Sequence, residues 1–94
     1  MENATEIKVE VKESDMEEPL VAAVLDIIRE SMKQFTIDKE VATYIKERLD
    51  KEYATTWHVI VGRSFGSRVS YEMSHFLLVK CNNKVNIMLF KCGY

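Results

Sequence analysis

TWHVIVGRSFGSRVSYE, residues 56–72, is the stretch that decides the fold. Its first half, Trp57–Val61, is β-branched and aromatic, which is typical of a buried or half-buried strand. Gly62 and Arg63 interrupt it, and Phe65–Tyr71 then alternates large or apolar side chains with small or polar ones. Because glycine and serine cover their backbone poorly, we interpret this second run as an edge strand whose N–H and C=O groups are open to pairing with another chain.

The first 13 residues are polar and charged, apart from an alternation of Ile7, Val9 and Val11. The period of two predicts a short peripheral strand in a partly flexible N-terminal segment, 1–13.

Two helices are predicted after this segment. The first has a capping-box pattern at Ser14–Glu17 and a proline, Pro19, in its first turn, and is expected over about Met16–Gln34. For the second, Thr36 is the expected N-cap and Asp38 lies in the first turn, where the helix dipole favours a carboxylate. Each helix has one apolar stripe: Leu20, Val24, Ile28 and Met32 in the first, and Ile37, Val41, Ile45, Leu49 and Tyr53 in the second.

From Thr56 onward every segment has the pattern of a strand, and the last two strands are joined by a turn at Asn82–Lys84. The four predicted strands are 57–61, 65–71, 75–81 and 85–92. Two helices followed by strands indicate an α+β fold, in which the helices pack on one face of an antiparallel sheet. We expect one domain over residues 1–94, and the initial Met and terminal Tyr94 are consistent with a complete chain.

Composition excludes several classes of function. With 47% apolar and 30% charged residues the chain is globular, and at 94 residues its core is modest, so burial against a second copy is a natural supplement. The net charge of −2 argues against a nucleic-acid partner. The sequence contains no apolar run near the roughly 20 residues that span a bilayer and no signal-like N-terminus, which predicts a soluble intracellular protein without membrane insertion.

The sequence predicts neither a metal site, a cofactor nor an enzyme. Its two cysteines and two histidines have no short paired spacing. Cys81 and Cys92 would lie at opposite ends of a strand, about 25 Å apart, which excludes a disulfide between them. A catalytic set could be imagined from His58 or His75, a cysteine and Glu72. The sequence has no phosphate loop, nucleophile elbow or carboxylate pair that would accompany such a set.

The eleven residues Trp57–Ser67, WHVIVGRSFGS, closely resemble the signature of the small, eight-kilodalton dynein light chain family. The likeness extends from about Val11 to Gly93, with KESDM before the first helix, IDK at the opening of the second and LFK near the end. Eleven consecutive residues of mixed chemistry form a far more specific signal than a short glycine motif. The resemblance implies a non-catalytic, homodimeric hub of the cytoplasmic, microtubule-associated dynein complex, which binds extended peptide segments of partners such as the dynein intermediate chain.

The resemblance also implies a site. In the family the edge strand is exchanged into the other subunit's sheet, and each of two grooves receives a peptide that often has a Thr-Gln-Thr-like core. The pairing strand carried over to this sequence is Arg63, Ser64, Phe65, Gly66, Ser67, Arg68, Val69, Ser70 and Tyr71. Asp38 and Lys39 would contact the peptide's central glutamine, and Phe76 and Leu78 would line the floor. The dimer interface would use Trp57, His58, Val61, Phe65, Ser67 and Val69.

His58 has two interpretations. From the residues alone it is a neutral core histidine. The resemblance places it near the two-fold axis, beside its own copy, where it is a candidate pH switch. Burial there would disfavour the protonated ring, so the dimer would lose stability as the pH falls.

Two alternatives to a peptide groove stay open. The edge strand is open to a simpler interpretation as a solvated edge protected by Arg68. The sequence also departs from the family pattern, with Tyr71 where histidine is usual, Arg68 where tyrosine is common, and Leu78 and Lys80 in place of aromatic residues. Main-chain pairing needs only backbone, whereas side-chain specificity depends on such positions. The alternative function is therefore a divergent structural light chain with altered or lost peptide specificity.

Overall fold

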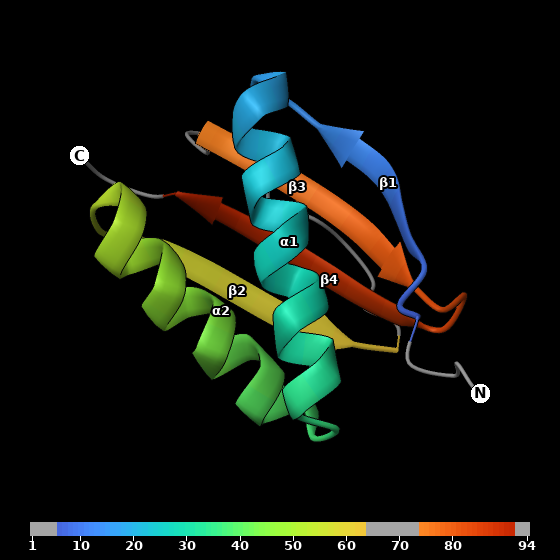
Figure 1. Ribbon diagram of the computed structural model, residues 1–94. Coiled ribbons are helices and arrows are strands. Elements are labelled where there is room, and N and C mark those ends of the chain that lie inside the picture. Colours follow the sequence, from blue (N-terminus) through green and yellow to red (C-terminus); the bar gives the residue numbers. More distant parts are fainter. Residues whose placement is uncertain (1–5, 64–73, 92–94) are drawn as a thin grey trace.

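Two helices lie across one face of a four-stranded antiparallel sheet in the computed structural model, which describes residues 6–63 and 74–91 (Figure 1). The elements in chain order are β1 (Val9–Ser14), α1 (Glu18–Gln34), α2 (Asp38–Tyr53), β2 (Trp57–Gly62), β3 (Ser74–Cys81) and β4 (Val85–Lys91). The strand order is β1-β3-β4-β2, so the hairpin β3-β4 is central and β1 and β2 are the edges. The predicted α+β architecture is confirmed.

The core lies between the helices and the sheet. In α2 the side chains of Val41, Ile45 and Leu49 are at most 2% exposed, which confirms that one face of this helix packs inward. Ile37, predicted as part of the same stripe, is instead 57% exposed, because it is the N-cap residue and precedes the first helical turn. The buried residues that meet α2 from α1 and the sheet are Val24, Ile27, Ile28, Trp57, Leu77, Val79, Ile87 and Leu89.

Both predicted N-caps are wrong. The N-cap of α1 is Glu17 and that of α2 is Ile37, and neither makes a side-chain capping bond. Ser14 is the last residue of β1, and its hydroxyl accepts a hydrogen bond from Met16 N–H at 3.0 Å. The prediction of Pro19 in the first turn of α1 is confirmed.

The start of α1 is displaced because the preceding segment is bound to β3. Asp15 N–H donates to the carbonyl of Phe76 at 3.0 Å, and Phe76 N–H donates to Asp15 Oδ1 at 2.6 Å. This pair of hydrogen bonds keeps the chain extended past Ser14, so the helix begins only at Glu18. A contact between residues 61 positions apart therefore outweighs the local capping pattern.

The β3-β4 turn at Asn82–Lys84 is confirmed. Asn82 and Asn83 have φ of 54° and 61°, a left-handed conformation that asparagine adopts more readily than most residues. Lys84 N–H closes the turn on the carbonyl of Cys81 at 3.0 Å. Asn82 also exchanges two bonds with Lys8, through its N–H at 2.8 Å and its Oδ1 at 3.0 Å, and so holds the N-terminal segment against the turn.

Asp50 joins the end of α2 to the start of β2. Its Oδ1 accepts a hydrogen bond from the main-chain N–H of the buried Trp57 at 2.9 Å, and its Oδ2 accepts one from Lys46 Nζ at 2.5 Å. Partial burial opposes ionisation of this carboxyl, but the bonds from Lys46 and Trp57 outweigh it, so the pKa of Asp50 lies below its ordinary value. Asp50 therefore sets where β2 begins.

Candidate functional site

β2, the first half of the sequence motif, is an edge strand of the sheet. It pairs with β4 from Trp57 opposite Lys91 to Gly62 opposite Asn86, and within residues 6–63 and 74–91 it has no strand on its other side. The predicted pairing residues Ser64–Tyr71, including the predicted interface residues Phe65, Ser67 and Val69, lie outside the described residues. The open edge itself is thus formed by β2.

Side chains of β2 alternate between the two faces of the sheet. Trp57 and Val61 point toward the helices, and Trp57 is 1% exposed in the chain's own core. His58 and Ile60 lie on the opposite, outer face; Ile60 is 43% exposed, and the His58 ring stacks on Phe90 with centroids 5.3 Å apart. Of the predicted interface residues in β2, His58 therefore has its side chain on the outer face, whereas Trp57 and Val61 pack on the side of the strand that faces the helices.

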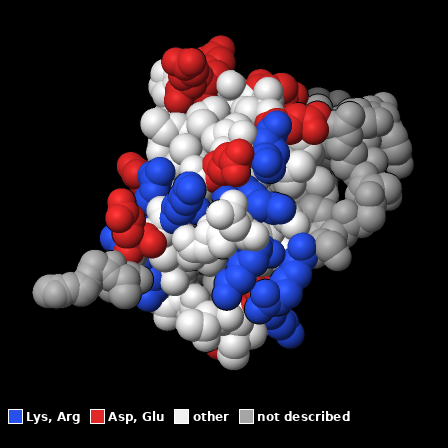
Figure 2. Space-filling model, turned by 90° about the vertical axis from the view of Figure 1, so that its right-hand side faces the viewer, with Lys and Arg blue, Asp and Glu red and all other residues white. Residues whose placement is uncertain are grey.

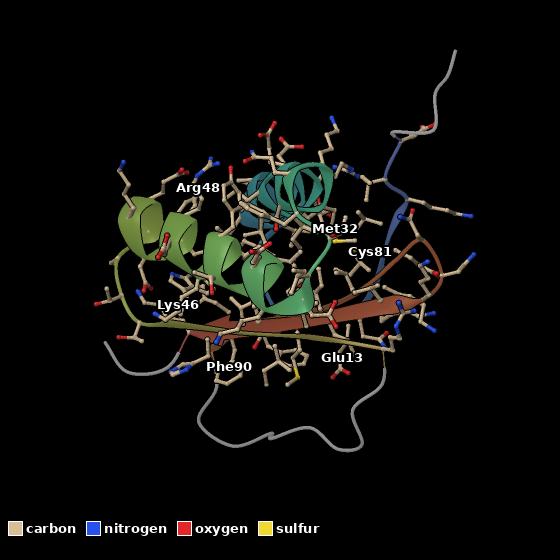
Figure 3. The ribbon with its side chains drawn as sticks, turned by 90° about the horizontal axis from the view of Figure 1, so that it is seen from below. Glu13, Met32, Lys46, Arg48, Cys81 and Phe90 are labelled. Carbon is tan, nitrogen blue, oxygen red and sulfur yellow. The ribbon has the colours of Figure 1, made fainter. Side chains whose placement is uncertain are left out.

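One apolar row crosses the outer face of the sheet. Ile60 pairs with Met88, and Met88 pairs with Leu78, so these side chains form one row across three strands. Figure 3 shows Phe90 projecting from the side of the sheet away from the helices. Phe76, one of the two predicted floor residues, is buried, and the other, Leu78, is half-buried.

Asp38 and Arg63 line one cavity of about 360 Å³, here called the α2-end cavity. Asp38 comes from the first turn of α2, and Arg63 follows β2, where its carbonyl accepts from Asn86 Nδ2 at 2.8 Å. The remaining lining residues come from the N-terminal segment, both helices, the loop between the helices, the β3-β4 turn and the start of β4: Ile7, Met32, Phe35, Thr36, Val41, Asn82, Lys84 and Val85. Two residues predicted separately for the site are thus brought together.

The charges around this cavity favour an anionic or strongly hydrogen-bonding ligand group. Arg63 and Lys84 line the cavity together with one carboxylate, that of Asp38, at a helix N-terminus that has no side-chain cap. Figure 2 shows that basic side chains gather over the middle and lower part of the β1 side of the molecule, whereas the top is acidic. Sequence reasoning missed Lys84 and Asn82; their signal was the Asn-Asn-Lys turn, which the pairing of β3 with β4 carries to the cavity.

Lys39, predicted beside Asp38, lines a different pocket on the exposed side of α2. Successive residues of a helix diverge by about 100°, so these two side chains point in different directions. The structure places Asp38 with Arg63 and leaves Lys39 outside that cavity.

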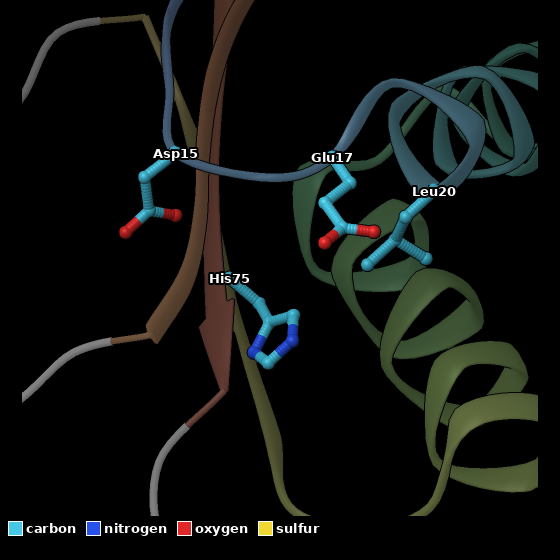
Figure 4. Close-up of a pocket in the computed structure, with 4 residues that line it drawn as sticks. All are labelled: Asp15, Glu17, Leu20 and His75. Carbon is cyan, nitrogen blue, oxygen red and sulfur yellow. The ribbon is translucent and has the colours of Figure 1, made fainter.

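The histidine and the cysteine of β3 lie at opposite ends of that strand. His75 borders a pocket of about 290 Å³ with Asp15, Glu17 and Leu20, and Figure 4 shows its imidazole and the Glu17 carboxylate pointing into this space. Cys81 is fully buried near the β3-β4 turn, and burial raises the pKa of its thiol to about 11. At about 3.3 Å per residue the two are too far apart to act as base and nucleophile.

The described residues include neither a candidate metal cluster nor a helix that could span a membrane. Among them, no three histidine, cysteine or acidic side chains lie close enough to hold a metal ion. No helix in the described part of the chain has the length and apolar character needed to cross a membrane.

Solved structures define the class of fold. The chain superposes on two structures of the dynein light chain-like domain of the Fasciola hepatica calcium binding protein FhCaBP2, with TM-scores of 0.76 and 0.78. Each match covers 92% of this chain and 93% or 92% of the other, at 15% sequence identity. The two-helix, four-strand arrangement is therefore the dynein light chain fold.

Sequence comparison gives the family. The model for dynein light chain type 1 matches residues 8–92. The chain is also 58% identical over 90 residues to the probable dynein light chain 2, cytoplasmic, of Caenorhabditis elegans, across 96% of this chain and 99% of that protein. The chain belongs to the dynein light chain family, and it is a non-catalytic protein, since the family is a structural component of the dynein complex.

Proposed function

We propose that this dynein light chain is a homodimeric hub that binds extended segments of partner proteins by β-strand addition. The observation that carries the proposal is the open edge of β2 beside the α2-end cavity. In this arrangement the segment Arg63–Tyr71 of a second copy pairs along β2, and a partner peptide pairs with that segment. Asp38 contacts the peptide's polar core, and Phe76 and Leu78 form the apolar floor.

The outer face of the sheet supports a second copy as the covering partner. Ile60 is 43% exposed in the single chain, and Leu78 in the same row is half-buried, whereas Met88 between them is only 4% exposed. The exchange of a strand would extend the sheet and bring this apolar row against its counterpart. A small chain gains core in this way that it cannot build alone.

The partners proposed are the dynein intermediate chain and other proteins with disordered linear motifs. Two grooves on one dimer bind two segments of a dimeric partner, and effective concentration then strengthens modest single-site affinities. The relative with 58% identity is described as cytoplasmic, which supports a location in the cytoplasm with the microtubule-associated dynein complex.

Calorimetric titration with a disordered peptide that carries a Thr-Gln-Thr core tests this proposal. We expect one peptide per subunit with micromolar affinity. Arg63→Gln should weaken binding about ten- to hundredfold, because a hydrogen bond from a charged group contributes about 1.5–3 kcal/mol. Lys51→Gln, the same charge change at the far end of α2, is the matched control.

The titration also separates the two functions. Absence of heat from a chain that sediments as a dimer would reject the peptide hub and favour a divergent structural light chain. Sedimentation between neutral and mildly acidic pH tests the role of His58: the dimer fraction should fall on acidification in the native chain and should stay constant in His58→Gln.

A further inference from the structure

The exposed side of α2 carries an ordered pair of aromatic rings. Phe35 ends α1 and Tyr44 lies in the second turn of α2, and their ring centroids are 5.7 Å apart at an interplanar angle of 50°. Arg48, one turn further along, holds the tyrosine: its guanidinium lies 5.6 Å from the ring centroid, and its Nη1 donates to the Tyr44 hydroxyl at 2.7 Å. Glu52 in turn accepts from Arg48 Nε at 2.7 Å. Figure 3 shows Arg48 on the side of α2 away from the sheet.

A pocket of about 400 Å³ opens beside these rings, here called the α2 side pocket. It is lined by Phe35, Lys39, Glu40, Thr43, Tyr44 and Glu47. Its volume lies near the lower end of the roughly 300–1,000 Å³ found for ligand sites. The aromatic rings are half-buried, whereas Glu40 and Glu47 are exposed at its rim.

The two glutamates have no partner in the part of the chain that the structure describes. Over residues 6–63 and 74–91 neither Glu40 nor Glu47 makes an ion pair or a side-chain hydrogen bond, not even with Lys39 in the same pocket. The pocket therefore combines aromatic faces with a net negative rim. An apolar occupant would remove these carboxylates from water without compensation, whereas a cation would gain from both features.

We propose that the α2 side pocket binds an arginine side chain of a partner protein. A planar guanidinium stacks on aromatic faces and pairs with carboxylates in a fixed fork, which a lysine ammonium does not do. Arg48 shows that Tyr44 already accepts one guanidinium on its ring. The incoming arginine packs against Phe35 and Tyr44 from the pocket side, since these rings already touch each other, and it pairs with Glu40 or Glu47.

This pocket is separate from the proposed peptide groove but adjacent to it. Phe35 lines both the α2 side pocket and the α2-end cavity, so a single extended segment can reach both. The other five lining residues of the α2 side pocket are not shared, and the arginine site needs neither a second copy nor an occupied groove.

Amide chemical shifts measured with a minimal probe test the proposal independently of the groove. The probe is Nα-acetyl-arginine methylamide, titrated to about 50 mM because one exposed cation–π contact with an ion pair supports only millimolar affinity. We expect saturable shifts at Thr43, Tyr44 and Glu47 that weaken with added salt. Equal shifts with the uncharged norleucine analogue, or no saturable shift, would overturn the proposal.

Charge-neutral variants locate the binding. Glu40→Gln and Glu47→Gln should each weaken the arginine probe about two- to fivefold, the range for exposed ion pairs. Glu18→Gln, at the other end of the helical layer, removes the same charge and should leave binding unchanged (Figure 1). Native affinity in both pocket variants would overturn the proposal, and loss of Thr-Gln-Thr peptide binding alone would not affect it.

Discussion

Replacing Asp50 by alanine tests how α2 is coupled to the edge strand β2. The substitution removes the acceptor of the buried Trp57 N–H and one partner of the Lys46 pair. An unsatisfied buried N–H costs about 1–3 kcal/mol. The lost i,i+4 pair adds about 0.3–0.5 kcal/mol, and the higher helix propensity of alanine returns up to about 0.7 kcal/mol. The expected loss in the free energy of unfolding is therefore about 1–3 kcal/mol.

The assay is urea unfolding followed by far-UV circular dichroism and by the fluorescence of Trp57, the one tryptophan of the sequence. Protein concentration is held constant, because association would shift the apparent stability. Lys46→Met is the matched control: it keeps the acceptor for Trp57 N–H and should cost no more than about 0.5 kcal/mol. Equal losses in Asp50→Ala and Lys46→Met would refute the role given to the Trp57 bond.

The hydrogen bonds of Asp50 also predict how the stability of the fold depends on pH. The pKa of Asp50 is lowered in the folded chain from an ordinary value of 3.8, so its ionised form stabilises the fold above that value. This contribution is lost as the pH falls through the folded pKa. The stability difference between the native chain and Asp50→Ala should be constant from neutral pH down to about 5 and should narrow below about 4. A difference that widened in acid would contradict the assignment.

Three further predictions concern other parts of the fold. Ser31 is fully buried and its hydroxyl donates to a main-chain carbonyl of α2 at 3.2 Å, so Ser31→Ala should cost about 1 kcal/mol in urea unfolding. In a Cys92→Ser background, Cys81 should react with a thiol reagent about a hundredfold more slowly before unfolding than after it, since burial raises its pKa from 9.0 to about 11; equal rates would contradict its burial. Ile60→Arg should convert a sedimenting dimer to monomer, whereas Thr43→Arg on the exposed side of α2 should not, and an unchanged Ile60→Arg dimer would exclude the outer face as the interface.

Local chemistry made most elements of this chain predictable. The stripes on both helices, the alternation in β2 and the Asn82–Lys84 turn are properties of neighbouring residues, and each was confirmed apart from Ile37 in the α2 stripe. The motif Trp57–Ser67 also predicted the family, because its mixed composition is specific enough to identify relatives without any knowledge of the fold.

The candidate site was only partly predictable. Asp38, Arg63 and the floor residues came from the resemblance, but their grouping did not. Arg63 lies at the same cavity as Asp38 because β2 runs antiparallel to β4 at the edge of the sheet, and Lys84 lies there because of the β3-β4 turn. No spacing in the sequence predicts that these residues line one cavity, since this depends on which strands become neighbours.

The sequence by itself determined the class of fold, the inward face of each helix and membership of the dynein light chain family, because these depend on periodicity and on a contiguous motif. Tertiary structure decided the strand order β1-β3-β4-β2, the open edge at β2 and the true start of α1. The capping pattern at Ser14 failed because Asp15 pairs with Phe76, a bond between distant residues that is worth more than a local cap. Long-range pairing of this kind follows from the packed arrangement of the whole chain, and short-range patterns cannot report it.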